Sequence, residues 1–197
     1  MKSSIPILPL LVLAAAPFAS AQYSSNPALN LAVADLATEE AQPKIVPTAD
    51  GGAYISWFSS DASGTPAYGY DVRLQKVDAG GHEMWGHGGV LIADRGFSST
   101  QDYSLDVDVA GFALLAFRDD RFGGTQITAT KVDPAGTQVW GPTGVQLTST
   151  TAFLAAPTIA GANDGGVFVG WTEDNSVGLQ HLSPLGTPTW GANIILS

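Results

Sequence analysis

The same short pattern occurs three times along the chain. In each copy an Asp or Ser is followed three residues later by Gly and, four residues after that, by the pair Trp-Gly. The copies are about 50 to 55 residues apart, and repeats of that length are typical of propellers, solenoids and arrays. The residues that define the pattern are Asp78, Gly81 and Trp85, then Asp133, Gly136 and Trp140, then Ser183, Gly186 and Trp190.

An aromatic residue marks a second fixed position in each repeat. Trp57, Phe117 and Trp171 each end a short run of aromatic and β-favouring residues, which predicts strands. Asp-Gly precedes two of these runs and predicts tight hairpins, because type I′ turns need positive φ. The Asp-x-x-Gly element predicts a second turn, in which Asp bonds its own backbone and Gly adopts a left-handed conformation.

This repeat predicts an all-β fold, a β-propeller-like array of about three four-stranded blades. Closed rings have about four to eight blades, so we expect a partial ring. The chain is then a fragment of a longer protein, an open arc, or a unit that self-associates through its open blade edges; the end at Ser197, where a further unit would begin, favours the first. The predicted blades span residues 43–94, 95–149 and 150–197.

The first residues predict export. Lys2 precedes an apolar run, and Ala19-Ser20-Ala21 forms a small-x-small cleavage site, so we predict a signal peptide over 1–21 and a secreted or periplasmic protein. The apolar run is too short to span a membrane, and prolines interrupt it. In the N-terminal segment 22–42, Asn30–Asp35 is similar to the last strand of each repeat and predicts a spare blade strand that closes a ring.

Composition restricts the partners. Asp and Glu number 18 against 8 Lys and Arg, a net charge of −10, which argues against nucleic acid because phosphate contacts need clustered basic residues. It argues equally against insertion into anionic membranes. The chain has no Cys, and its three His lack the spacing of a metal site, so we predict no metal. No phosphate loop or dinucleotide fingerprint occurs, and we predict no cofactor.

The second copy shows the repeat in its fullest form. It reads Phe117-Arg-Asp119-Asp-Arg121, then Gln126-Ile-Thr-Ala-Thr, then Asp-x-x-Gly-x-x-x-Trp-Gly. This resembles a repeat of large exported bacterial proteins with the form W-x-D-x-R, D-I-Y-x-Q and D-x-x-G-x-x-x-W-G. The first copy lacks the Asp and Arg after Trp57, and the third has Asn175 in place of the Arg. The resemblance covers about residues 28–197 and implies a propeller-like secreted or surface protein without a defined activity.

One loop varies in length between copies, between the aromatic residue and the next strand. Variable loops on a constant scaffold commonly carry binding sites. The longest runs from Ser59 and carries Asp61, Tyr68 and Tyr70, a composition that suits sugars or protein surfaces, although an ordinary solvent loop is the alternative. Asp119 and Arg121 form either a structural ion pair or a carbohydrate or carboxylate contact.

The repeat tryptophans are interpreted as packing between blades, and no residue is predicted to be catalytic. We therefore predict a non-enzymatic binding or scaffold protein with a carbohydrate or protein ligand. The alternative is a fragment of a propeller glycoside hydrolase or lyase whose catalytic residues lie outside this chain. A structural fragment without activity of its own is the third reading.

Overall fold

The structure, a computed structural model, describes residues 31–37, 39–61, 69–96 and 103–197. Within these ranges the chain forms twelve strands and no helix, so the described part contains no helix capable of crossing a membrane. The strands are β1 (Glu40–Pro47), β2 (Ala53–Asp61), β3 (Gly69–Val77), β4 (Val90–Ala93), β5 (Ser104–Val107), β6 (Ala113–Asp119), β7 (Gln126–Val132), β8 (Val145–Gln146), β9 (Leu154–Gly161), β10 (Val167–Glu173), β11 (Ser176–Leu182) and β12 (Ile194–Leu196).

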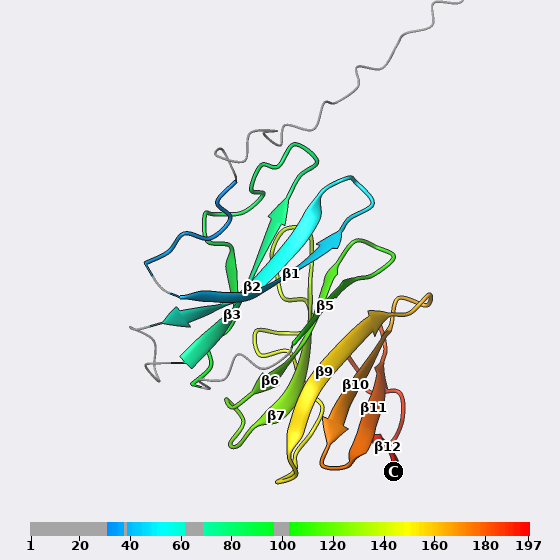
Figure 1. The fold of residues 1–197 in the computed structure, drawn as a ribbon. Coiled ribbons are helices and arrows are strands. Elements are labelled where there is room, and N and C mark those ends of the chain that lie inside the picture. Colours follow the sequence, from blue (N-terminus) through cyan, green and yellow to red (C-terminus); the bar gives the residue numbers. More distant parts are fainter. Residues whose placement is uncertain (1–30, 38, 62–68, 97–102) are drawn as a thin grey trace, which may run out of the picture.

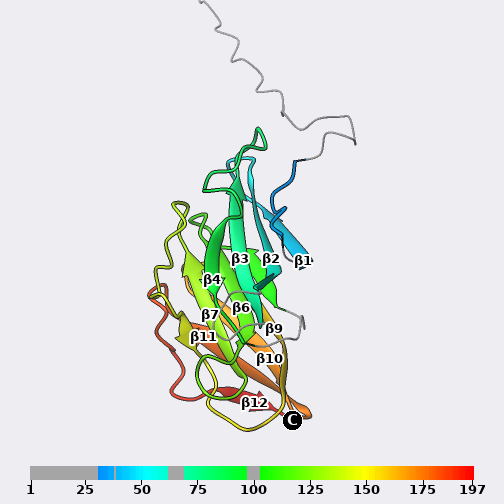
Figure 2. The ribbon, with the colours of Figure 1, turned by 90° about the vertical axis from the view of Figure 1, so that its left-hand side faces the viewer.

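These strands form three antiparallel sheets in chain order. Blade 1 contains β1 to β4, blade 2 contains β5 to β8, and blade 3 contains β9 to β12, with each strand paired to the next along the chain. The sheets lie with their faces together, one after another (Figure 1), and the view from the side shows the succession of blades (Figure 2). The predicted fold, an all-β array of three four-stranded propeller blades, is confirmed.

Some boundaries differ from those expected. β1 begins at Glu40, ahead of the Pro43 where the first blade was predicted to start. The closing strand expected at Asn30–Asp35 is not found in the described part of that stretch, because residues 31–37 form no strand. The predicted signal peptide lies outside the described residues. Each repeat Trp lies in the connection that precedes the last strand of its blade.

The core consists of two apolar layers, one between each pair of neighbouring blades. Alternate side chains of a strand point to opposite faces of its sheet, so a blade between two others buries both faces. Every residue of β6 and β7 is accordingly buried. In the first layer Tyr54, Phe58, Val72 and Leu74 of blade 1 meet Ala113, Leu115 and Phe117, and in the second Leu114, Ala116 and Ile127 meet Val167, Val169 and Trp171.

The connections collect at two ends of the array, because neighbouring strands run in opposite directions. One end, the Trp-turn end, holds the hairpins that start each blade and the connections with the repeat Trp. The other, the variable-loop end, holds the loop between the second and third strand of each blade and the links from one blade to the next. The described ends of the variable loops therefore lie at the same end of the array.

Candidate functional site at the variable-loop end

The tryptophans of the first two repeats lie at the blade junctions. Trp85 Nε1 donates a hydrogen bond to the Pro134 carbonyl at 3.2 Å, and Trp140 Nε1 donates to the Pro184 carbonyl at 3.0 Å. Each indole also covers the turn glycine of the next blade: a Cβ on Gly186 would lie 2.8 Å from Trp140 Cγ. These indoles are used in packing blade on blade.

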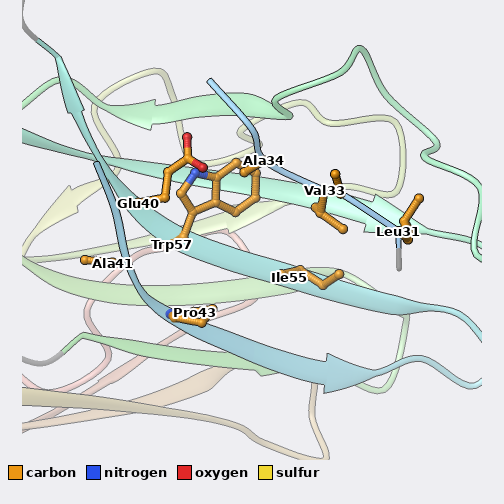
Figure 3. A pocket seen from close by; sticks show the side chains of 9 residues that line it. Leu31, Val33, Ala34, Glu40, Ala41, Pro43, Ile55 and Trp57 are labelled. Carbon is orange, nitrogen blue, oxygen red and sulfur yellow. The ribbon is translucent and has the colours of Figure 1, made fainter. Parts of the chain in front are cut away.

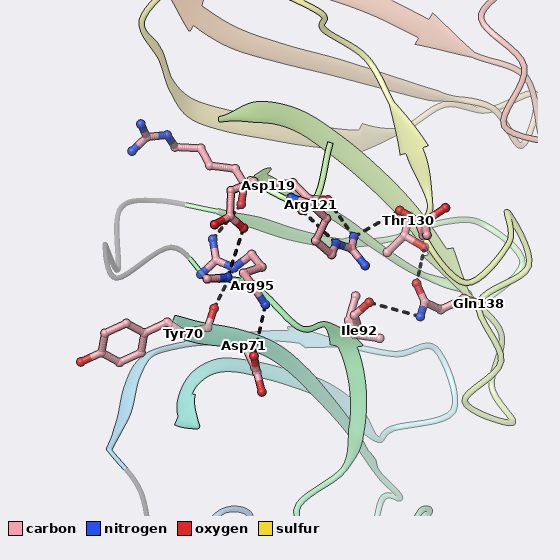
Figure 4. Close-up of polar contacts among 12 residues, drawn as sticks. Tyr70, Asp71, Ile92, Arg95, Asp119, Arg121, Thr130 and Gln138 are labelled. Atoms are coloured by element: carbon pink, nitrogen blue, oxygen red, sulfur yellow. Dashed lines mark hydrogen bonds and ion pairs between the residues drawn. The ribbon is translucent and has the colours of Figure 1, made fainter. Parts of the chain in front are cut away.

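Arg95 fills the junction of blades 1 and 2 at the variable-loop end (Figure 4). Its Nε donates to the Tyr70 carbonyl and its Nη1 to the Arg118 carbonyl, both at 2.7 Å, and its guanidinium lies 4.4 Å from the centre of the Phe58 ring. Burial lowers the pKa of Arg95 to about 10, and the nearby carboxylate of Asp119 opposes that shift. Arg95 thus joins blade 1 to blade 2.

Asp119 and Arg121, the pair predicted from the sequence, bond to each other (Figure 4). Arg121 Nε donates to Asp119 Oδ1 at 2.9 Å, and Arg121 Nη2 donates to Asp119 Oδ2 at 2.7 Å. The Asp119 side chain is fully buried, while the guanidinium is partly exposed and also donates to the Thr143 carbonyl at 3.3 Å. The carboxylate is closed to solvent, so a ligand could reach this pair only through Arg121.

The predicted residues of the long loop are only partly visible. Tyr70 lies near the start of β3, and its hydroxyl donates to Glu39 Oε2 at 2.7 Å. Tyr68 lies outside the described residues, and of Asp61 the structure describes only the backbone, which pairs with Gly69 at the end of β2. Their role in binding stays a prediction.

A groove opens at the same end, between blades 2 and 3. This blade 2–3 groove has a volume of about 290 Å³. It lies between the β6–β7 loop and the link from β8 to β9. The described residues that line it are Arg118, Gly123, Gly124, Thr125, Thr150, Thr151, Ala152, Phe153 and Leu154, and none of them is acidic.

An exposed aromatic ring and a largely buried cation line this groove. Phe153 is 55% exposed although it is a large apolar side chain, and the Arg118 guanidinium lies 5.7 Å from the centre of its ring. Burial lowers the pKa of Arg118. At Gly123 a Cβ would meet nothing within 4 Å, so the backbone of the β6–β7 loop leaves this side of the groove open.

Hydrogen bonds fix the link that carries Phe153. Gln126 Nε2 donates to the Thr150 carbonyl at 2.9 Å, and Gln126 Oε1 accepts from the Thr150 N–H at 3.2 Å. The Phe153 N–H donates to Asp174 Oδ1 at 2.9 Å, and the Asp174 N–H donates back to the Phe153 carbonyl at 2.8 Å. The groove is therefore preorganised, which lowers the entropic cost of binding.

This groove was not among the sites predicted from the sequence. Its signal was present as Thr150-Thr-Ala-Phe153, a link with hydroxyls and an aromatic ring, and as Gly123-Gly124 in the preceding loop. Only the topology brings the two segments together. Among the described residues, no group of three His, Cys, Asp or Glu side chains is placed to hold a metal ion.

The three blades, with tryptophans that join each of the first two to the next, form a propeller-like fold. No family model and no curated protein matches the chain. Among solved structures, a thermostable family-43 glycoside hydrolase is similar with a TM-score of 0.48 and 16% identity, over 80% of this chain and 56% of that protein. An endo-1,5-α-L-arabinanase from Thermotoga petrophila has a TM-score of 0.46 and 14% identity, over 77% and 42%. An endo-arabinase from Bacteroides thetaiotaomicron has 0.39 and 13%, over 77% and 59%. The chain spans about half the length of these proteins.

Proposed function

We propose that this protein is an exported, non-enzymatic binding protein and that it holds a carbohydrate in the blade 2–3 groove. The observation that carries the proposal is the composition of the groove: an exposed ring at Phe153, threonine hydroxyls and the Arg118 guanidinium. An aromatic face covers the apolar face of a sugar ring, while hydroxyl and guanidinium groups bond the sugar hydroxyls. A half-open groove with a few convergent polar groups is a common form of ligand site.

The carboxylates at this end bear on the enzymatic alternative. Glycoside hydrolysis commonly needs two Asp or Glu side chains that flank the scissile bond. No acidic side chain lines the described part of the groove, and Asp119 gives both of its oxygens to Arg121. A hydrolase acting in this groove would need its catalytic pair from outside the described lining, so binding without turnover fits the lining residues better.

The test is a screen of polysaccharides with protein purified after expression of the full chain in a secreting host. We expect retention of at least one polysaccharide with no release of reducing ends. Phe153→Ala should weaken that binding about tenfold, equivalent to about 1.4 kcal/mol, because the stacking face is lost. Val109→Ala is the matched control, since Val109 is exposed in a hairpin at the Trp-turn end.

Two results would overturn the proposal. Release of reducing ends would make the protein an enzyme, and equal affinities of the Phe153 variant and the wild type would place the ligand elsewhere. A protein ligand would show itself differently, because stable protein interfaces bury about 1,200–2,000 Å² and would extend well beyond this groove.

A further inference from the structure

Each blade has two faces with different neighbours. In blades 1 and 2 the forward face packs on the next blade along the chain and includes Tyr54 and Leu114. Phe168 holds the same repeat position in blade 3. The back face packs on the preceding blade and includes Leu115 in blade 2 and Val169 in blade 3. Equivalent positions in the repeat therefore show how deeply each face is buried when a neighbouring blade packs on it.

The forward face of blade 3 departs from that pattern of burial. Tyr54, Leu114 and Phe168 occupy the same repeat position, yet the first two are 0% exposed and Phe168 is 41% exposed. Val177, at the same repeat position as the fully buried Val72 and Ile127, is 50% exposed. An apolar sheet face that is buried wherever a blade follows is open here.

Trp190 lies at the edge of the same face. It occupies the repeat position of Trp85 and Trp140, whose indoles donate to the next blade. Its ring lies 6.0 Å from that of Phe168 and 6.1 Å from that of His181, centre to centre, and no described residue supplies its Nε1 with a carbonyl. The donor that joins one blade to the next is unused in blade 3.

The back face of blade 1 shows the complementary departure. Ile45 is 70% exposed, whereas Ile159, at the same repeat position in blade 3, is 4% exposed. Pro43 is exposed, whereas its counterparts Tyr103 and Pro157 are buried.

The N-terminal segment covers this face only in part. Figure 3 shows Leu31 and Val33 alongside Ile55. A groove of about 290 Å³ lies between this segment and the sheet. The described residues 31–37 of this segment form no strand.

We propose that the forward face of blade 3 binds the back face of blade 1 in a second copy of this chain, head to tail. Trp190 Nε1 then donates to the Ala79 carbonyl of the second copy, because Ala79 holds the place in its turn that Pro134 and Pro184 hold in theirs. Pro43 of the second copy enters a hollow of about 270 Å³ on the forward face, which Gly170 and Val177 line. Tyr103, the counterpart of Pro43, lies against Ser56, the counterpart of Gly170.

The same contact made twice closes a ring. Head-to-tail interfaces form rings when the rotation closes and filaments when it does not. Three blades are too few for a closed propeller, whereas two copies carry six, within the usual range of about four to eight. Residues 31–34 must leave the back face on association, and this breaks no strand pairing because they make none.

Light scattering on the purified protein tests the proposal by molar mass. We expect the wild type to have twice the mass of one chain. Phe168→Glu on the forward face and Ile45→Glu on the back face should each give a monomer. Phe153→Glu is the matched control, since Phe153 is also an exposed aromatic residue of the last repeat but lies off the forward face, and it should remain a dimer.

Mixing the two monomeric variants tests whether the copies associate head to tail. The Phe168 variant keeps its back face and the Ile45 variant keeps its forward face, so an equimolar mixture should regain dimers through one intact interface. A monomeric wild type, a dimeric Ile45→Glu variant or a concentration-dependent series of larger masses would overturn the proposal. Near-UV circular dichroism confirms that each variant is folded, and Phe168→Ser with Ile45→Ser replaces any variant that is not.

Discussion

Two glycines have nearly the same backbone conformation, but only one of them lies under an indole. Comparing them distinguishes the stability that the indole contact contributes from the cost of backbone strain. Gly186 has φ +79° and lies under Trp140, whereas Gly111 has φ +83° and a Cβ there would meet nothing within 4 Å. Left-handed geometry costs an L-residue about 1–2 kcal/mol. Gly111→Ala should lower the free energy of unfolding by only that amount. Gly186→Ala should lose about 3 kcal/mol or more, because displacing a well-packed side chain adds about 1–3 kcal/mol. The free energy of unfolding in urea measures both, and equal losses would mean that the indole contact adds no stability.

Asp108 and Asp50 each form an ion pair from a hairpin that starts a blade. They differ in burial and should therefore differ in how much they contribute to the free energy of unfolding. In the Asp108–Lys131 ion pair, 2.7 Å long, the Asp108 side chain is 0% exposed and the Lys131 side chain 8%. In the Asp50–Lys76 pair, 3.0 Å long, the Asp50 side chain is 57% exposed. Asp108→Asn keeps the volume but leaves a buried ammonium without its counter-charge, at a cost of about 3–5 kcal/mol. Asp50→Asn should cost less than about 1 kcal/mol. Denaturant unfolding compares them, and a similar loss at both sites would contradict this assignment.

At the level of elements, Tyr103 ties the first strand of blade 2 to blade 1. Its hydroxyl lies 2.9 Å from the Gln42 carbonyl and 2.8 Å from the Ser56 carbonyl, and accepts from Ser56 Oγ at 2.9 Å. Burial raises the pKa of Tyr103 to about 12, and that of Tyr54 to about 12 as well, from 10.0. Since the folded protein holds these protons more tightly than the unfolded chain, their contribution is complete below pH 10.0 and is lost as the pH rises towards about 12.

Melting temperatures between pH 9 and 12 measure this effect. We expect a decline across that range, and a shallower decline for Tyr103→Phe, because one of the two titrating hydroxyls is gone. The same variant should already be less stable at pH 8 by about 1–2 kcal/mol through its lost hydrogen bonds. Identical slopes for variant and wild type would show that Tyr103 does not titrate with unfolding.

The strands and turns could be predicted from the sequence where nearby residues alone determine them. Aromatic runs predicted β2, β6 and β10, and the Asp-x-x-Gly turns lie where the spacing put them. The start of β1 was not predictable, because Pro43 lacks an N–H and reads as a strand start. The ladder instead continues past it through a bulge at Gln42, whose φ of 51° no local pattern announces.

At the scale of the whole molecule, the candidate site could not be predicted from the sequence, because it forms where two blades meet. The blade 2–3 groove is formed by Phe153 from one link and Gly123 from another loop, and their approach depends on how blade 3 packs on blade 2. The Asp119–Arg121 pair was foreseeable because two residues at that spacing reach each other locally. Its burial followed only from the packing of the blades.

The measurement that tests the proposed site most directly is an NMR titration. Isotope-labelled protein would be titrated with an oligosaccharide from the best-retained polysaccharide, and amide shifts would be mapped on the chain. We predict shifts that cluster at residues 123–125 and 150–154 and vanish in Phe153→Ala, with the hairpin at 108–112 unaffected. Shifts centred away from the groove, or unchanged by the loss of Phe153, would contradict the assignment of the blade 2–3 groove as the binding site.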